Sequence, residues 1–274
     1  MTLDGAGLET RCPLDNGRHT TRARYSLGQL DDLPSEIITA ILLSLDLVTL
    51  TTFRRVNNRA MELVDSLTEY TKVIKHCPNV LRAILCLGAT SFDLKRLHST
   101  LSSSRCAACH DGFGNYLYLI TCERVCYPCF TSNVEYFPLE LDQVLEYTAV
   151  AAPHVKLEDL PRVLSVSGRE TGVRIPLFDR LAVLAAVPDP PARAFDPSGD
   201  FRRAEPRRFM AVIEAPYFPV RGAGRGGGGA SWGYYCVRCR VERGPGHMGC
   251  RVKFTRDGFL GHLGSVHDFD VGEV

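Results

Sequence analysis

No stretch of this 274-residue sequence contains about eighteen consecutive apolar residues, the length that a helix needs to cross a bilayer. A membrane-spanning helix is therefore not expected. The opening residues, Met-Thr-Leu-Asp-Gly, contain neither the basic start nor the apolar core of a secretory signal peptide. We expect a protein that is not secreted.

The signatures of several common enzyme classes are also absent from the sequence. There is no nucleotide-binding loop, no Gly-x-Ser-x-Gly turn and no His-Glu-x-x-His step. Cys122 and His110 could be imagined as a nucleophile and its base, but their place in a cysteine cluster favours a structural role. We predict that the chain is not an enzyme.

The net charge is only +1, but it is unevenly distributed along the chain. Residues 201–256 contain twelve Arg or Lys and three Glu, a local net charge of +9. Residues 30–66 contain six acidic and three basic residues, a local net charge of −3. We expect the two ends of the chain to meet different partners.

Cysteine is abundant, and its distribution indicates a reducing compartment. Eight of the eleven cysteines fall in two clusters, 106–129 and 236–250. A disulfide-stapled secreted domain would be shorter and denser in cysteine. We therefore expect a cytoplasmic and/or nuclear protein with reduced thiols.

The first cluster has the spacing of a four-thiolate zinc site. Two Cys-x-x-Cys steps are separated by sixteen residues, and two such turns can supply the four corners of tetrahedral zinc. A site closed by four protein ligands is structural. Cys122 could compete for the metal, and His110 is disfavoured as a ligand. The predicted ligands are Cys106, Cys109, Cys126 and Cys129.

The second cluster resembles a zinc finger with a long intervening loop. A Cys-x-x-Cys step is followed by a predicted helix with two histidines five positions apart, a spacing that still permits both to reach one metal. Cys250 and His247 lie in the loop and are rival ligands. The predicted ligands are Cys236, Cys239, His262 and His267.

Hydrophobic periodicity predicts short helices along the first part of the chain. Residues 33–66 show three of them, with Asp46 as the cap of the second. A strand is expected at Tyr116–Ile120. Further helices are predicted at about 68–77, 79–87, 91–101 and 139–151.

The first of these helices resemble a known module. The register of Leu33-Pro34, Ile37-Ile38, Ile41-Leu42, Leu45-Asp46, Leu50 and Phe53-Arg54-Arg55-Val56 is similar to the F-box. This resemblance implies a three-helix module that docks on the Skp-type adaptor, and through it on the cullin scaffold, of Skp–cullin–F-box ubiquitin ligases. It implies adaptor contacts through Leu33, Pro34, Ile37, Ile38, Ile41, Leu42, Leu45, Leu50 and Val56.

A second resemblance covers the cysteine-rich middle of the chain. The order of an F-box, short helices and a Cys-rich segment is similar to a fungal group of F-box proteins with a zinc-binding middle region. The residues that carry this likeness are Cys106, Cys109, Leu117-Tyr118-Leu119, Thr121-Cys122-Glu123-Arg124, Cys126 and Cys129. It brings no known substrate with it.

Together these patterns predict a mainly α protein with a small zinc-stabilised α+β region. The expected order is a disordered arm (1–29), an F-box-like module (30–66), a helical and zinc-binding region (67–187), a Pro/Arg- and Gly-rich linker (188–231) and a finger-like segment (232–274). The predicted function is that of a substrate receptor in a ubiquitin ligase, with structural zinc as its cofactor. The alternative is a nucleic-acid binder that uses the basic C-terminal region.

Overall fold

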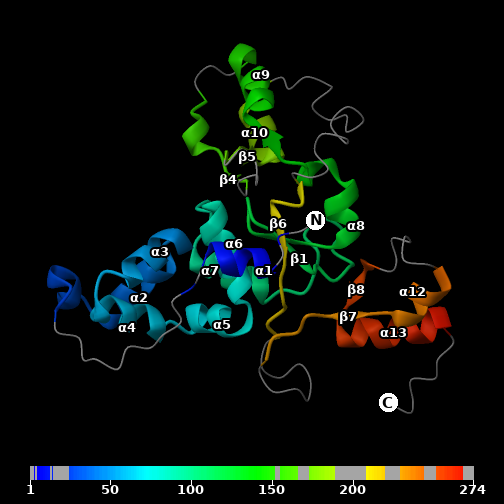
Figure 1. Cartoon of the computed structure of the whole chain (residues 1–274), viewed down its shortest axis with the longest axis horizontal. Coiled ribbons are helices and arrows are strands. Elements are labelled where there is room, and N and C mark those ends of the chain that lie inside the picture. Colours follow the sequence, from blue (N-terminus) through cyan, green and yellow to red (C-terminus); the bar gives the residue numbers. More distant parts are fainter. Residues whose placement is uncertain are drawn as a thin grey trace.

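The computed structural model describes residues 3, 5–12, 14, 25–151, 155–165, 173–188, 208–219, 229–243 and 251–267. Within these residues the protein is mainly helical and contains three small antiparallel sheets. Figure 1 shows a group of short helices on the left, a central sheet, an upper lobe and a C-terminal unit at the lower right. None of the described helices combines the length and apolar character needed to cross a membrane.

Short helices joined by tight turns build the N-terminal part. They are α1 (Gly5–Arg11), the 3₁₀ helix η1 (Gly28–Asp32), α2 (Ser35–Leu43), α3 (Leu47–Arg54), α4 (Asn58–Ser66), α5 (Thr68–His76), α6 (Pro78–Leu87) and α7 (Leu94–Leu101). Helices this short are marginal in isolation, so packing between them must stabilise them.

Local capping marks several of these helix ends. Asp46 accepts a hydrogen bond from the Thr49 N–H at 2.9 Å and begins α3, as predicted from the sequence. Asp93 begins α7 in the same way through the Arg96 N–H, at 2.7 Å. Gly88 ends α6 in the left-handed conformation, with φ 64°, which glycine adopts without steric cost.

The central sheet joins segments that lie far apart in the chain. Buried Arg124 donates hydrogen bonds to the carbonyls of Gly114 (2.7 Å), Ala215 (2.9 Å) and Pro216 (2.8 Å), and so fastens the hairpin to the strand beside it. All neighbouring strands are antiparallel, in the order β2 (Glu123–Val125), β1 (Tyr116–Tyr118) and β6 (Val212–Glu214).

The upper lobe follows the short helix α8 (Tyr127–Ser132) and has a small core of its own, separate from the main one. Its strands pair in the order β3-β5-β4, and two helices cover them. The elements are η2 (Val134–Tyr136), β3 (Leu139–Glu140), α9 (Leu141–Ala151), η3 (Leu157–Asp159), β4 (Arg162–Leu164), β5 (Pro176–Phe178) and α10 (Arg180–Ala186).

The C-terminal unit is a two-stranded hairpin with two helices. Gly233, with φ 72°, comes so close to the Phe113 ring that a Cβ there would lie 2.6 Å from it. Lys253 pairs with Glu214 of the central sheet. These contacts hold the unit against the rest of the molecule. Its elements are β7 (Tyr234–Tyr235), α12 (Val237–Arg243), β8 (Lys253–Phe254) and α13 (Arg256–His267).

The main hydrophobic core runs without a break from the first helices to the central sheet. It includes Leu42 of α2, Leu50 of α3, Ile84 of α6, Leu117 of β1 and Ile213 of β6. The F-box-like module was predicted to end at residue 66, but the hydrophobic core continues past this position without interruption.

Two of the predicted unstructured segments contain regular structure. The arm predicted at 1–29 contains the helix α1, which packs against α6. Its Leu8 is buried and belongs to the main hydrophobic core. The linker predicted at 188–231 contains β6, because its apolar residues Ala211, Val212, Ile213 and Ala215 are buried. Both corrections concern a few apolar residues inside polar or Gly- and Pro-rich stretches.

Candidate functional site

Helix α2 has apolar side chains on two neighbouring faces. Ile38 and Leu42 point into the core and are only 4% and 2% exposed. Ile37 and Ile41, each one position earlier, are 48% and 39% exposed. Since positions four apart share a helix face, Ile37 and Ile41 form an outward stripe, and the exposed Leu33 lies just before the helix. We call these three residues the α2 outer stripe.

The nine residues predicted to contact an adaptor thus divide into two groups. Pro34 and Val56 are exposed like the α2 outer stripe, and Leu45 is half-buried against the core. Ile38, Leu42 and Leu50 are core residues, so in this structure they support the surface rather than form it. Periodicity alone missed this division, because both stripes of α2 are aliphatic.

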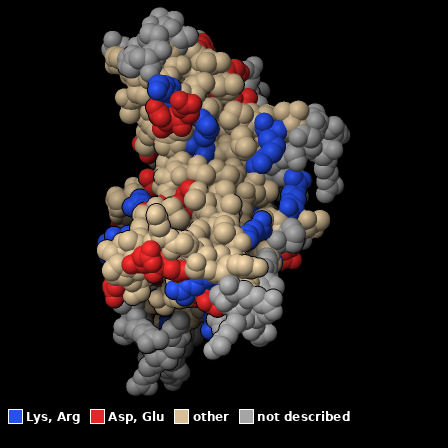
Figure 2. Space-filling model, turned by 90° about the vertical axis from the view of Figure 1, so that its left-hand side faces the viewer, with Lys and Arg blue, Asp and Glu red and all other residues tan. Residues whose placement is uncertain are grey.

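Polar contacts fasten the helices beneath this surface. Arg54 at the end of α3 donates to both carboxylate oxygens of Asp65 on α4, at 2.8 and 3.1 Å. Arg59 of α4 pairs with Asp31 of η1 at 3.0 Å. The Leu27 N–H, and after it Arg59, lowers the pKa of the Asp31 carboxyl. Figure 2 views the molecule from the side where these helices lie; charged side chains are scattered there between areas of uncharged surface.

The four cysteines predicted for the first metal site lie together. The Sγ atoms of Cys106, Cys109, Cys126 and Cys129 are all within 4.8 Å of one another, and those of Cys109 and Cys126 are 3.9 Å apart. The Cys126 N–H donates to the Cys106 Sγ at 3.3 Å. His110 adopts φ 61° directly after the first Cys-x-x-Cys step and is not part of this group.

The thiols of this region differ in acidity. The Cys126 side chain, and after it backbone N–H groups of the same turns, lower the pKa of the Cys106 thiol to about 4. Burial instead raises the pKa of Cys122 to about 12, and its Sγ lies 3.8 Å from the Thr100 Oγ1. Burial raises the pKa of Cys129 to about 12 as well, so acidity does not distinguish the predicted ligands from Cys122. Cys122 is a packed thiol because it is buried and lies outside the group of four sulfurs.

The second predicted quartet also converges. The Cys236 Sγ lies 3.2 Å from the His267 Nε2, and the Cys239 Sγ lies 3.3 Å from the His262 Nε2. All four ligand atoms are within 4.8 Å of one another, so this group too could hold a metal ion. The rival ligands Cys250 and His247 lie outside the described residues.

The hairpin β7–β8 and α13 position these ligands. The strands pair Tyr234 with Phe254, and the Phe254 ring stacks on His262 with centroids 4.6 Å apart. Helix α13 carries both histidines, and the Cys-x-x-Cys step precedes and enters α12. The unit thus brings the predicted Cys and His side chains together, and its cysteine step continues into a short helix, α12.

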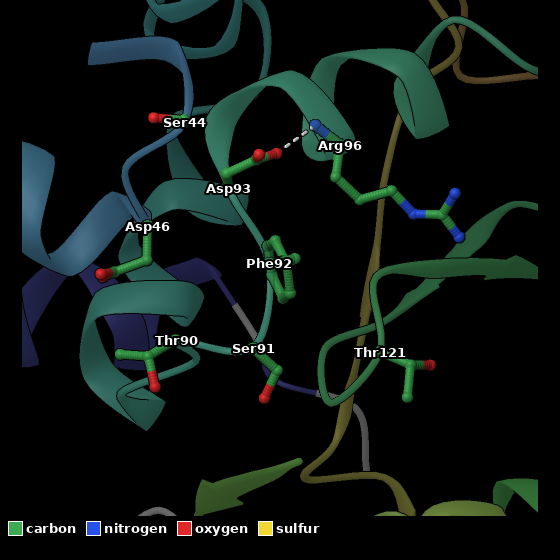
Figure 3. A pocket seen from close by; sticks show the side chains of 8 residues that line it. All are labelled: Ser44, Asp46, Thr90, Ser91, Phe92, Asp93, Arg96 and Thr121. Carbon is green, nitrogen blue, oxygen red and sulfur yellow. Dashed lines mark hydrogen bonds between the residues drawn. The ribbon is translucent and has the colours of Figure 1, made fainter. Parts of the chain in front are cut away.

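A hollow of about 570 Å³ lies where the first helices meet the central hairpin. Its lining includes Asp46, Asp93, Phe92 and Thr121, and Figure 3 shows the Arg96 side chain extending away from Asp93 toward the Thr121 side. Both aspartates already cap helices. The hollow therefore lies between the capped ends of α3 and α7, and we assign it no ligand.

Comparison with known proteins gives one match. Residues 30–72 match the F-box domain family, which extends the predicted end of the module from residue 66 into α5. No curated protein and no solved structure matches the chain. The likeness of the middle region to a fungal group stays a prediction. F-box proteins are typically non-catalytic adaptors, and the F-box itself binds Skp-type adaptors. Residues 30–72 of this chain, which carry the α2 outer stripe, are an F-box domain.

Proposed function

We propose that this chain is a substrate receptor of a Skp–cullin–F-box ubiquitin ligase, bridging the Skp-type adaptor to a target protein. The α2 outer stripe is the observation that carries the proposal. A helix that is apolar on two faces normally has both of them covered. Full burial of an aliphatic side chain contributes about 1.5–3 kcal/mol, and Leu33, Ile37 and Ile41 still have 39–48% of their surface to bury.

In this role the chain needs no catalytic residue. The ubiquitin-transfer chemistry belongs to the partner proteins, and the receptor contributes proximity by holding the target near them. The F-box would bind the adaptor, and the remainder of the chain would hold the target. The proposal also places the chain in the cytosol or nucleus, where thiols remain reduced.

Zinc is the metal that we propose for both cysteine groups. Thiolate and imidazole donors are typical zinc ligands. With Zn–S bonds of about 2.3 Å, two sulfurs of a tetrahedral site lie about 3.8 Å apart. The 3.9 Å between the Sγ atoms of Cys109 and Cys126 agrees with this value. Four protein ligands close each site, so the metal would stabilise structure rather than bind a substrate.

Co-expression with a Skp-type adaptor tests the proposal. The native chain should be captured stoichiometrically with the adaptor. The double variant Leu33→Asp/Ile37→Asp places two charges in the α2 outer stripe and should abolish capture, because a buried unpaired carboxylate is costly. Pull-down followed by size-exclusion chromatography measures the complex.

A matched control is available in the upper lobe. Ile175 and Leu181 are 39% and 49% exposed, close to the 39% and 48% of Leu33 and Ile37. The variant Ile175→Asp/Leu181→Asp should bind the adaptor like the native chain. Failure of the folded native chain to bind, or equal loss in both variants, would refute the proposal.

A further inference from the structure

The C-terminal unit exposes aromatic side chains that are usually covered. The chain has a single tryptophan, Trp232, and 42% of its surface is exposed. Tyr234 and Tyr235 of β7 are 48% and 43% exposed. Tryptophan is highly buried on average, and Trp and Tyr are enriched among residues that dominate binding energy at interfaces.

Helix α12, which follows directly, adds an exposed aliphatic stripe. Val237 and Val241 are 70% and 77% exposed, and they lie four positions apart on one face of the helix. Valine is a poorer helix former than alanine or leucine, so these residues do not favour the helix by propensity. Their exposure is unfavourable in water unless a partner covers them.

Side-chain contacts connect α12 to α13. Cys239 lies in the helix, and its Sγ is 3.2 and 3.3 Å from the Nε2 atoms of His267 and His262 on α13. Arg238 also donates to the carbonyl of His267, at 3.3 Å. The stripe is thus presented on a supported element, which lowers the conformational cost of binding.

The C-terminal unit carries an excess of positive charge. Residues 229–242 and 251–267 contain five Arg or Lys and two Asp or Glu, which gives 5 − 2 = +3. Arg238 pairs with Glu242 at 2.7 Å, whereas Arg240, exposed and one position before Val241, forms no ion pair with any residue that the structure describes. A negatively charged partner would complement Arg240.

We propose that the α12 stripe of Val237, Arg240 and Val241, together with the exposed Trp232 five residues before Val237, is the target-docking surface, and that it binds an acidic segment of a target protein with apolar anchor residues. This inference rests on the proposed receptor function and names the chemistry of its target. A nucleic acid fits less well, because bare valines offer phosphates no donor. In addition, Arg256 is the only Arg or Lys of α13.

Intrinsic fluorescence of the zinc-loaded full chain tests the proposal, since Trp232 is its only tryptophan. The probe is a soluble peptide of repeated Glu-Leu-Glu-Glu-Phe units, which carries acidic and apolar residues but no tryptophan. We expect a saturable blue shift of the emission as the peptide covers Trp232. The same peptide with Lys in place of Glu should bind at least about ten-fold more weakly.

Variants then locate the binding surface. Val237→Asp/Val241→Asp should weaken binding of the Glu peptide at least about ten-fold. Val173→Asp, at a valine of the upper lobe that is 62% exposed, should leave binding unchanged. Arg240→Glu provides a second test at an exposed position. It should weaken binding of the Glu peptide and strengthen binding of the Lys peptide. Zinc content and melting temperature establish that each variant is folded.

Three results would overturn the inference. They are the absence of a saturable shift, equal affinity for the Glu and Lys peptides, and tighter binding of a single-stranded oligonucleotide that the valine variants leave unchanged. Adaptor capture by the same preparations depends on the F-box and not on α12. Normal capture with no peptide binding would therefore refute the docking surface while leaving the receptor function supported.

Discussion

At the scale of single residues, Arg124 fixes the hairpin that carries part of the first cysteine group. Its guanidinium is buried, and burying a charge is costly unless hydrogen bonds compensate. Three backbone carbonyls supply those bonds. Burial lowers the pKa of Arg124 to about 10, so the side chain remains a cation at neutral pH. It stands two residues before Cys126, and therefore couples β6 to a predicted metal ligand.

Gly114 lies directly against Arg124, so we predict that any larger residue at this position destabilises the protein. A Cβ at this position would lie 2.9 Å from the Arg124 Cβ and 3.3 Å from the Arg105 carbonyl oxygen. Gly114→Ala should therefore lower the free energy of unfolding by about 1–3 kcal/mol, measured by urea denaturation. The control is Gly261→Ala in α13, where nothing lies within 4 Å of the new methyl group. That change should be neutral or stabilise by up to about 1 kcal/mol; equal losses in both variants would contradict the packing described.

At the scale of secondary-structure elements, the F-box depends on how α3 and α4 are joined. The Arg54 side chain of α3 forms two hydrogen bonds with the Asp65 carboxylate of α4, and Arg54 is only 7% exposed. Paired hydrogen bonds from a guanidinium to a carboxylate are strong and directional. The contact joins the end of α3 to α4.

Two adjacent arginines offer a direct comparison. Arg54→Met should destabilise the protein by about 2–3 kcal/mol, because Asp65 would stay mostly buried without its partner. Arg55→Met, at the exposed next position, should change stability by less than about 0.5 kcal/mol. Thermal denaturation gives the stability difference, and adaptor capture should fall only in the first variant. Similar behaviour of the two variants would mean that the ion pair does not hold the module together.

At the scale of the whole molecule, the two cysteine groups are placed differently. Cys106 and Cys126 belong to the main core, which extends into the F-box helices. Cys236 and Cys239 are buried within the C-terminal unit and lie outside that core. Metal binding to folded ligands contributes directly to folding free energy. Loss of each metal should therefore affect a different part of the protein.

Serine substitutions should separate the two effects. Cys106→Ser should lower the main melting transition and reduce adaptor capture, because the F-box shares its core. Cys236→Ser should remove one zinc and loosen the C-terminal unit, while adaptor capture remains. Calorimetry measures the melting transition of each variant, and zinc analysis measures its metal content. The control is Cys122→Ala, which alters a packed thiol and should keep the full zinc content. An equal fall of the main transition in both serine variants would contradict the separation.

Local patterns in the sequence were sufficient to predict the helices, the Asp46 cap and the two groups of Cys and His side chains that lie together. Helix periodicity, capping and Cys-x-x-Cys spacing involve residues a few positions apart, so they are visible without knowledge of the fold. The structure places the predicted ligands together at both groups. The F-box register was recognisable for the same reason.

Other features depend on contacts between distant segments. Which stripe of α2 faces outward, the docking of α1 on α6 and the pairing of β6 with β1 could not be derived from periodicity. Ile37 and Ile38 are chemically identical neighbours, and only the packing of α2 against the core makes one exposed and the other buried. The α12 stripe likewise could be identified only from the structure, which shows that Cys239 is buried against α13 while Val237 and Val241 are exposed. Burial is a property of the assembled chain, because it depends on which segments approach in space and not on a residue's own chemistry.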